Sequence, residues 1–310
     1  MERIVQYAGE HSEEERQELR ERLRGVLSER GPVDLDELGA QLLRTGADFA
    51  YYPKNELARL IHGAVAELAV TRESSILHPE RLAALRDGPA VFLSNHLSYS
   101  DANLFVILLE RAGYRDIADR LTVIAGPKVY SDPMRRFASL CFGTIKTPQS
   151  STRSSDEAVM SPREVARLAL ETIEIARERQ RAGDALLLFV EGTRSRTASM
   201  QRALPAVARY LEDPESLLVP VGVTGSERFI PVGEERLHPT LVHFQIGHAA
   251  KAGALAERCD GNRRLTMDAI GVAIARLLPP EYRGIYGEAS ASEPDLREAF
   301  VAADSVFSGA

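Results

Sequence analysis

The spacing of apolar residues changes near residue 80 of the chain. Before that point, apolar side chains recur every three or four positions, which is typical of helices with one buried face. Ser12 and Glu15 form a capping-box pattern that predicts the start of a first helix, and further helices are predicted over 34–44 and from about residue 53. We therefore expect only helices in residues 1–80, arranged as a small N-terminal helical domain. A lid or a membrane-facing surface over a binding site is the alternative role of these helices.

After residue 80, short apolar runs of the β type alternate with helical patterns. Strands are predicted over 90–94, 121–125, 142–145, 185–190, 217–223 and 240–246. Helices are predicted over 101–112, 133–140, 162–182, 202–212 and 263–278. This alternation favours an α/β fold, in which a central and mostly parallel sheet is flanked by helices. We expect this α/β domain to span 81–287, with a polar surface loop at 147–158 and a flexible tail over 288–310.

Composition and charge narrow the possible partners. The 310 residues suffice for one large domain and a smaller one, and 27% of them are charged, as in an ordinary globular protein. The formal net charge of −7 argues against nucleic acid and against broad electrostatic docking on anionic lipid. No apolar run approaches the roughly twenty residues of a spanning helix, and the first residues lack the apolar core of a secretory signal. We expect a cytoplasmic protein that visits a membrane only peripherally, through weak, local and hydrophobic contacts.

Neither the cysteines nor the histidines show the spacing of a metal site. Cys141 and Cys259 are far apart and are expected to stay reduced. His238, His243 and His248 recur every five residues, but in a strand that interval alternates between the two faces. We therefore expect no metal ion.

A histidine and an aspartate follow the first predicted strand. In SNHLSYSD, residues 94–101, His96 precedes Asp101 by five positions, which on one helix would point the two about 140° apart. We therefore expect His96 on a loop and Asp101 in the first turn of a helix capped by Ser98 or Ser100. A carboxylate bound to one imidazole nitrogen leaves the other able to accept a proton, as a general base requires near neutral pH. The alternative is that Asp101 only caps the helix and His96 only packs.

A second polar segment, FVEGTRSRT at 189–197, follows another apolar run. Arg194 and Arg196 carry forked donors that suit a phosphate group, and ligands of α/β proteins bind at the ends of strands. Gly192 allows the backbone to turn closely there. Glu191 is expected to hold a substrate hydroxyl or to orient an arginine, while the alternative for Arg196 is a solvated surface position.

These segments resemble the motifs of a known family. NHLSYSD resembles the NHxSxxD motif of the glycerolipid acyltransferase superfamily, which includes glycerol-3-phosphate and lysophosphatidic acid acyltransferases. FVEGTRSRT is similar to its FPEGTRS motif, with Val190 in place of proline, and VPVGVTGS at 219–226 resembles its fourth motif. The resemblance covers about 80–287 and implies the glycerol-3-phosphate acyltransferase-like fold. It implies that His96 and Asp101 are catalytic and that substrate is bound by Glu191, Gly192, Thr193, Arg194 and Arg196.

One motif departs from the pattern of the family. In GTIKTPQ at 143–149, Gln149 stands where relatives carry an arginine that helps to hold the glycerol phosphate. Lys146 of the same segment is a candidate for the replacement charge, and Lys128, in GPKVY, lies where relatives carry a lysine. We therefore include Lys128 and Lys146 among the expected substrate-binding residues, and a specialised acceptor stays open.

The resemblance implies transfer of a fatty acyl group from acyl-CoA or acyl carrier protein to a hydroxyl of lysophosphatidic acid or glycerol 3-phosphate. His96 would be the general base oriented by Asp101, Arg194 would bind the acceptor phosphate, and backbone amides of 192–194 would stabilise the oxyanion. The thioester is a co-substrate, and no cofactor is expected. The alternatives are a thioester hydrolase, in which His96 activates water, and a non-catalytic phospholipid-binding module.

Overall fold

The computed structural model describes residues 4–5, 12–85, 88–148, 160–234 and 236–309. Within these residues the chain forms a nine-stranded sheet, ordered β1-β5-β4-β6-β3-β7-β8-β2, with β9 paired to β7. Its strands are β1 (Tyr51–Tyr52), β2 (Ser75–Leu77), β3 (Ala90–Ser94), β4 (Leu121–Ala125), β5 (Gly143–Lys146), β6 (Ala185–Phe189), β7 (Leu217–Thr224), β8 (His243–Ile246) and β9 (Ala250–Lys251).

The five central strands, β5, β4, β6, β3 and β7, run parallel. The outer pairings of β1 with β5, and of β8 and β9 with β7, are antiparallel, whereas β2 is parallel to β8. The predicted mostly parallel sheet flanked by helices is confirmed, and each of the six predicted strands occurs. Every residue of β3 is buried, as expected for a strand that is covered on both faces.

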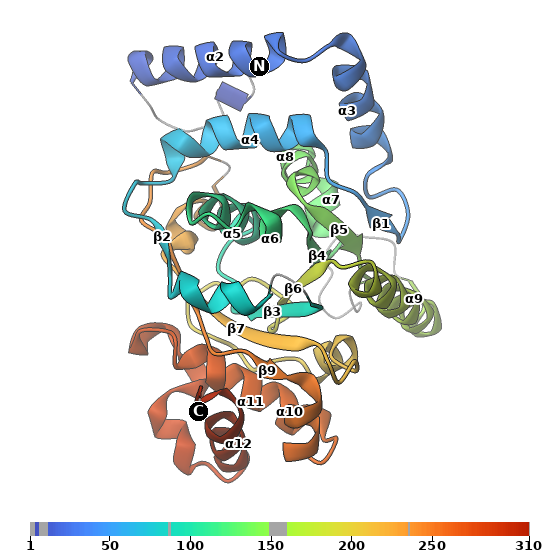
Figure 1. The fold of residues 1–310 in the computed structure, drawn as a ribbon, viewed down its shortest axis with the longest axis vertical. Helices are drawn as coiled ribbons and strands as arrows, with labels where there is room; N and C mark the ends of the chain where they lie inside the picture. Colours follow the sequence, from blue (N-terminus) through green and yellow to red (C-terminus); the bar gives the residue numbers. More distant parts are fainter. Residues whose placement is uncertain (1–3, 6–11, 86–87, 149–159, 235, 310) are drawn as a thin grey trace.

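Helices cover both faces of the sheet. They are α2 (Glu13–Ser28), α3 (Pro32–Arg44), α4 (Glu56–Ala69), α5 (Asp101–Arg111), α6 (Arg115–Asp119), α7 (Lys128–Ser131), α8 (Pro133–Ala138), α9 (Pro162–Arg181), α10 (Ala252–Arg258), α11 (Arg263–Ala275) and α12 (Arg297–Phe307). Short 3-10 helices are η1 (Pro79–Leu85), η2 (Ser139–Cys141), η3 (Pro205–Tyr210), η4 (Ser226–Arg228), η5 (Pro280–Tyr282), η6 (Gly284–Tyr286) and η7 (Glu288–Ser292). Figure 1 shows α2, α3 and α4 at one end of the molecule and α10, α11 and α12 at the other, with the sheet between them.

Alternate residues of the central strands point into two separate hydrophobic clusters. Phe92 of β3 joins the cluster on the side of α4 and α5, whereas Val91 and Leu93 join the cluster on the side of α11 and α12. The sheet is thus the middle layer of three, and the loops at the carboxyl ends of its parallel strands all open along one edge.

The N-terminal segment differs from the prediction in one respect. The capping box predicted at Ser12 and Glu15 begins α2, as expected. The expectation of helices only in 1–80 is wrong, because β1 and β2 lie in this segment and join opposite ends of the sheet. Strands of two and three residues are too short to show alternation in the sequence. The domain boundary at residue 80 stays a prediction.

Two further predictions about local structure fail. The helix expected over 202–212 is only the 3-10 helix η3, because Pro205 holds Leu204 in an extended conformation and no helix can run through it. The segment expected as a flexible tail instead forms η7 and α12, which buries Ala299, Ala302 and Ala303 against α11. The loop predicted over 147–158 lies, from residue 149 on, outside the described residues.

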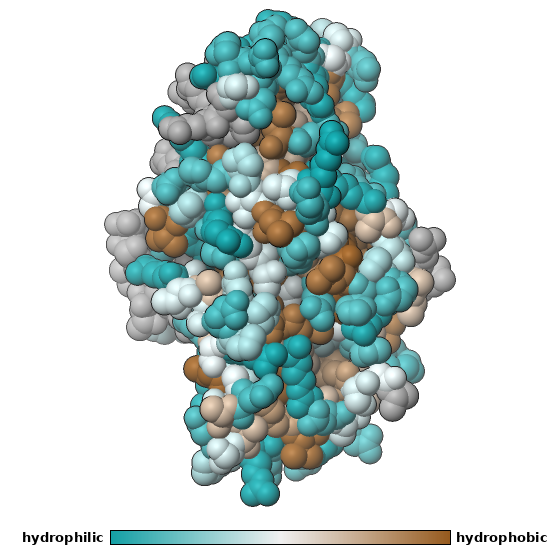
Figure 2. Space-filling view, turned by 90° about the vertical axis from the view of Figure 1, so that its left-hand side faces the viewer, coloured by the Kyte–Doolittle hydropathy of each residue, from teal (hydrophilic) through white to brown (hydrophobic). Residues whose placement is uncertain are grey.

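Figure 2 shows how polar and apolar residues are distributed on one side of the molecule. On the side shown in Figure 2, apolar residues form separate patches among polar ones. Within the described part of the chain, none of the helices combines the length and the apolar character needed to cross a membrane.

Candidate active site

The two motif loops leave the sheet from adjacent strands. Ser94 at the end of β3 pairs with Phe189 at the end of β6, so the segments that follow run side by side. The backbone of His96 is held by the second loop at both of its polar groups. Its amide donates to Glu191 Oε1 at 3.0 Å, and its carbonyl accepts from the Ser195 amide at 2.8 Å. Each loop therefore fixes the position of the other.

His96 and Asp101 form the predicted pair. Nδ1 of His96 lies 2.8 Å from Oδ2 of Asp101, whose side chain is fully buried in the first turn of α5. A carboxylate accepts but does not donate, so Nδ1 carries the proton of the neutral imidazole and Nε2 is left as the acceptor. The His96 side chain is 13% exposed, which leaves the ring partly accessible from solvent.

Asp101 also holds the loop that precedes it. Its Oδ2 accepts from the amides of Leu97 and Ser98 at 2.8 and 3.0 Å, and its Oδ1 accepts from the Ser226 hydroxyl at 2.6 Å. Four donors therefore fix the carboxylate of Asp101. It stabilises the loop after β3 and also accepts a hydrogen bond from the imidazole of His96. Ser100 occupies the N-cap position of α5, as one of the two predictions had it, but its side chain makes no cap bond, and Ser98 Oγ accepts from the Ser100 amide.

Two residues that sequence reasoning did not single out support this pair. Asn95 is buried and exchanges hydrogen bonds with the backbone of Val223 at 3.0 and 2.8 Å, which extends the pairing of β3 with β7. Gly225 brings Ser226 to Asp101 through a turn with φ of +86°, where an added Cβ would lie 2.1 Å from the Leu241 carbonyl oxygen. The only signal for Ser226 in the sequence was its place in VPVGVTGS.

An aromatic ring fixes the plane of the imidazole. Phe189 stacks on His96 with the ring centroids 4.0 Å apart and the planes 19° from parallel. Tyr99 approaches the same imidazole edge-on, at 6.4 Å between centroids. Together with Asp101, these rings restrict rotation of His96, which a free histidine would undergo.

Glu191 ties the two loops together. Its side chain is buried, and its oxygens accept from the His96 amide and, at 2.8 Å, from the Gln201 amide. Burial raises the pKa of the Glu191 carboxyl, while the bonds from Gln201 and His96 act in the opposite direction. These contacts differ from both roles expected of Glu191, because they bind it to the backbone of the loops.

The other residues of the second motif lie nearer the surface. Arg194 is half-buried and its Cζ lies 4.6 Å from the centre of the Tyr99 ring, whereas Thr193 and Arg196 are exposed. Gly192 is also exposed, has φ of +64°, and donates its amide to the Phe189 carbonyl in the turn after β6. The Gly192 amide is therefore used within the turn. Of the backbone amides of 192–194 that were expected to stabilise an oxyanion, those of Thr193 and Arg194 stay candidates.

The two predicted lysines lie along the same edge of the sheet, on other strands. Lys146 ends β5, where its Nζ donates to the Gly46 carbonyl at 2.8 Å and lies 4.7 Å from the centre of the Phe49 ring. Lys128 begins α7, after β4, and is half-buried. The described contacts thus bring His96, Asp101 and Arg194 together but hold Lys146 against the N-terminal segment. Gln149 lies outside the described residues.

A further arginine reaches the site from α8. The Cζ of Arg135 lies 4.7 Å from the centre of the Tyr99 ring, so two guanidiniums contact the same tyrosine. Sequence reasoning missed Arg135 because it lies on a short helix outside both motifs.

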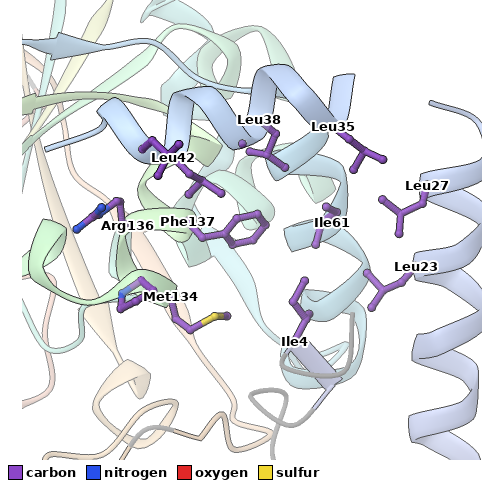
Figure 3. A pocket seen from close by; sticks show the side chains of 13 residues that line it. Ile4, Leu23, Leu27, Leu35, Leu38, Leu42, Ile61, Met134, Arg136 and Phe137 are labelled. Atoms are coloured by element: carbon purple, nitrogen blue, oxygen red, sulfur yellow. The ribbon is translucent and has the colours of Figure 1, made fainter. Parts of the chain in front are cut away.

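An apolar pocket of about 700 Å³ lies on the other side of α8. Its lining comes from α2, α3, α4 and α8, and Figure 3 shows side chains such as Leu23, Leu38 and Phe137 gathered around it. Leu35 and Leu43 also line it and are 46% and 82% exposed, so the pocket opens to the surface at α3. Helix α8 lines this pocket through residues such as Met134 and Phe137, and it carries Arg135 against Tyr99.

The fold and the site define an α/β protein with a carboxylate-oriented imidazole beside a pair of arginines. Residues 75–224 match the protein family described as Acyltransferase. The matched segment runs from the start of β2 to the end of β7 and contains both motif loops.

Among solved structures, the chain is similar to the 1-acyl-sn-glycerophosphate (LPA) acyltransferase PlsC from Thermotoga maritima. The two are 15% identical over 69% of this chain and 77% of that chain, with a TM-score of 0.38. No curated protein matches the sequence significantly.

Proposed function

We propose that this acyltransferase moves a fatty acyl group from a thioester of CoA or acyl carrier protein to a hydroxyl of lysophosphatidic acid or glycerol 3-phosphate. The observation that carries the proposal is the 2.8 Å contact between His96 Nδ1 and the buried Asp101, beside a half-buried Arg194. A base oriented in this way suits an alcohol, and a guanidinium next to it suits a phosphate.

In the proposed reaction, Nε2 of His96 takes the proton of the acceptor hydroxyl while its oxygen attacks the thioester carbonyl carbon. A C–O bond forms and the carbonyl oxygen becomes an oxyanion, to which the amides of Thr193 and Arg194 would donate hydrogen bonds. The intermediate collapses, the C–S bond breaks, and the imidazolium returns its proton to the departing thiolate. Asp101 stabilises the imidazolium between these steps, as the carboxylate does in a catalytic triad.

The apolar pocket supports a long-chain substrate. At about 700 Å³ it has the size of pockets that hold small ligands, which are roughly 300–1,000 Å³. Each buried methylene contributes about 0.8 kcal/mol, so a pocket of this kind favours long acyl chains. We assign it to the acyl chain of the thioester, because the helix that lines the pocket, α8, also carries Arg135, which contacts Tyr99 beside His96.

The test is thiol release from palmitoyl-CoA and from palmitoyl-acyl carrier protein, with no acceptor, with glycerol 3-phosphate and with lysophosphatidic acid. We expect release to depend on one acceptor, and His96→Ala to lower kcat by a factor of about 10²–10⁴ without lowering Tm. His238→Ala is the matched control, because the His238 side chain is 43% exposed and, among the described contacts, its imidazole bonds only to Glu234.

Other outcomes point to other functions. Release that needs no acceptor would make the protein a thioester hydrolase. Turnover by His96→Ala above about a tenth of wild type would remove His96 as the base.

A further inference from the structure

We propose that Arg135 of α8 is a second binding residue for the acceptor phosphate, acting together with Arg194. This inference rests on the proposed function and names a specificity-determining residue of the same site. Arg135 lies outside every motif of the sequence and on a different element from both loops.

The geometry of Tyr99 carries the inference. The guanidinium carbons of Arg135 and Arg194 lie 4.7 and 4.6 Å from the centre of its ring. The ring itself lies 6.4 Å from that of His96. Tyr99 thus has both cations against its ring next to the base, with their guanidinium carbons at most 9.3 Å apart.

The charges at this place favour an anion. Two guanidiniums near one ring repel each other, and a doubly charged phosphate between them would turn that repulsion into attraction. Among the described residues, the acid that forms an ion pair with this pair of arginines is Asp132, whose Oδ1 lies 3.6 Å from Arg135 Nε. One carboxylate against two guanidiniums leaves a net positive charge. Arg135 and Arg194 are half-buried, so water screens this charge less than at the open surface.

The neighbouring cations have other partners. Arg136 donates through Nε and Nη2 to the Tyr130 carbonyl at 2.9 and 2.6 Å, which holds α8 to α7. Lys146 donates to the Gly46 carbonyl. Among the described contacts, Arg135 is therefore the cation of α8 that shares the Tyr99 ring with Arg194.

The experiment compares Arg135→Ala and Arg135→Lys with wild type, using glycerol 3-phosphate as acceptor. The Arg258→Ala variant is the control, since Arg258 is exposed on α10 at the far side of the sheet. We expect Arg135→Ala to raise the acceptor KM about tenfold while kcat and the thioester KM stay within about twofold. Arg135→Lys should recover part of the loss, and with monoacylglycerol, which lacks the phosphate, Arg135→Ala should match wild type.

Binding measured without turnover separates this inference from the proposed function. Titration calorimetry with glycerol 3-phosphate should give a Kd about tenfold weaker for Arg135→Ala than for wild type, even if no thiol is released. An unchanged Kd and KM, or an equal rise in the KM of the thioester, would overturn the role of Arg135. Absence of binding by wild type would overturn the phosphate site as a whole, whereas binding without acyl transfer would overturn only the enzymatic function.

Discussion

The two motif loops differ in how firmly their side chains are held. In the loop after β3, Asn95 and Asp101 are buried, and both polar atoms of each side chain form hydrogen bonds. In the loop after β6, Glu191 is bound in the same way, but Gly192 and Arg196 are exposed. Buried acceptors fix the geometry of the base, while the side chains available to select a substrate lie further out. Changes to the buried polar residues of the first loop should therefore abolish turnover, and changes in the outer part of the second loop should weaken binding.

The strongest test of this contrast is Asp101→Asn. Asparagine replaces one carboxylate oxygen with an NH2 group. At the position of Oδ2, that group would face two backbone amides that in the wild type donate to Oδ2, so donor would meet donor. It would also favour the tautomer of His96 whose Nε2 carries the proton. We expect kcat to fall by a factor of about 10³–10⁴. Stopped-flow or continuous thiol assays measure it, with Asp304→Asn on α12 as the exposed control. Activity within about tenfold of wild type at a native Tm would reduce Asp101 to a structural residue.

Glu191→Gln tests the link between the loops. Glutamine can accept from only one of the two backbone amides, so its NH2 group faces the other as a second donor. The free energy of unfolding should fall by about 1–3 kcal/mol, as seen in denaturant titrations, and kcat should fall with it. Glu257→Gln, on the exposed surface of α10, is the control. A Tm equal to that of wild type would mean that these two hydrogen bonds do not hold the loops.

Arg194→Ala probes the outer part of the second loop. Loss of the guanidinium beside Tyr99 should raise the acceptor KM about tenfold and leave kcat within a few-fold, because the base is untouched. Initial rates at varied glycerol 3-phosphate measure both constants. Arg196→Ala, in the same loop but exposed, should have the smaller effect. If the two variants behave alike, the position of Arg194 on the ring gives it no special role.

The smallest effect is expected at Tyr99, the ring that both arginines contact. Tyr99→Phe keeps the aromatic face, whereas Tyr99→Leu removes it and with it about 0.5–1 kcal/mol of cation–π attraction for each arginine. The acceptor KM should rise a few-fold in Tyr99→Leu and stay near wild type in Tyr99→Phe. Equal KM values in the two variants would show that the ring does not position the arginines.

The sequence predicts the centre of the fold better than its edges. Strands β3 and β4 begin and end where the apolar runs do, since these strands are buried on both faces. Strands β1 and β9 have two residues each and leave no pattern to detect. Helix α12 was missed because it is buried through alanines, which carry little hydrophobic signal.

The same limit applies to the site. His96 and Asp101 were predicted because they lie in one short segment that follows a predicted strand and resembles a family motif. Phe189, Ser226 and Arg135 reach the site only through the packing of separate elements, which no local pattern encodes. For the same reason, the sequence did not indicate that Lys146 donates to the Gly46 carbonyl, and its role in binding substrate stays a prediction.

Helix α8 has only six residues, yet it borders both the apolar pocket and the arginine pair. Met134 and Phe137 face the pocket, and Arg135, between them in the chain, faces Tyr99. A bulkier side chain introduced to shorten the pocket would shift the same helix that carries the arginine. Attempts to engineer chain-length preference and head-group preference separately would therefore meet a trade-off at this helix, and variants selected for one should be screened for the other.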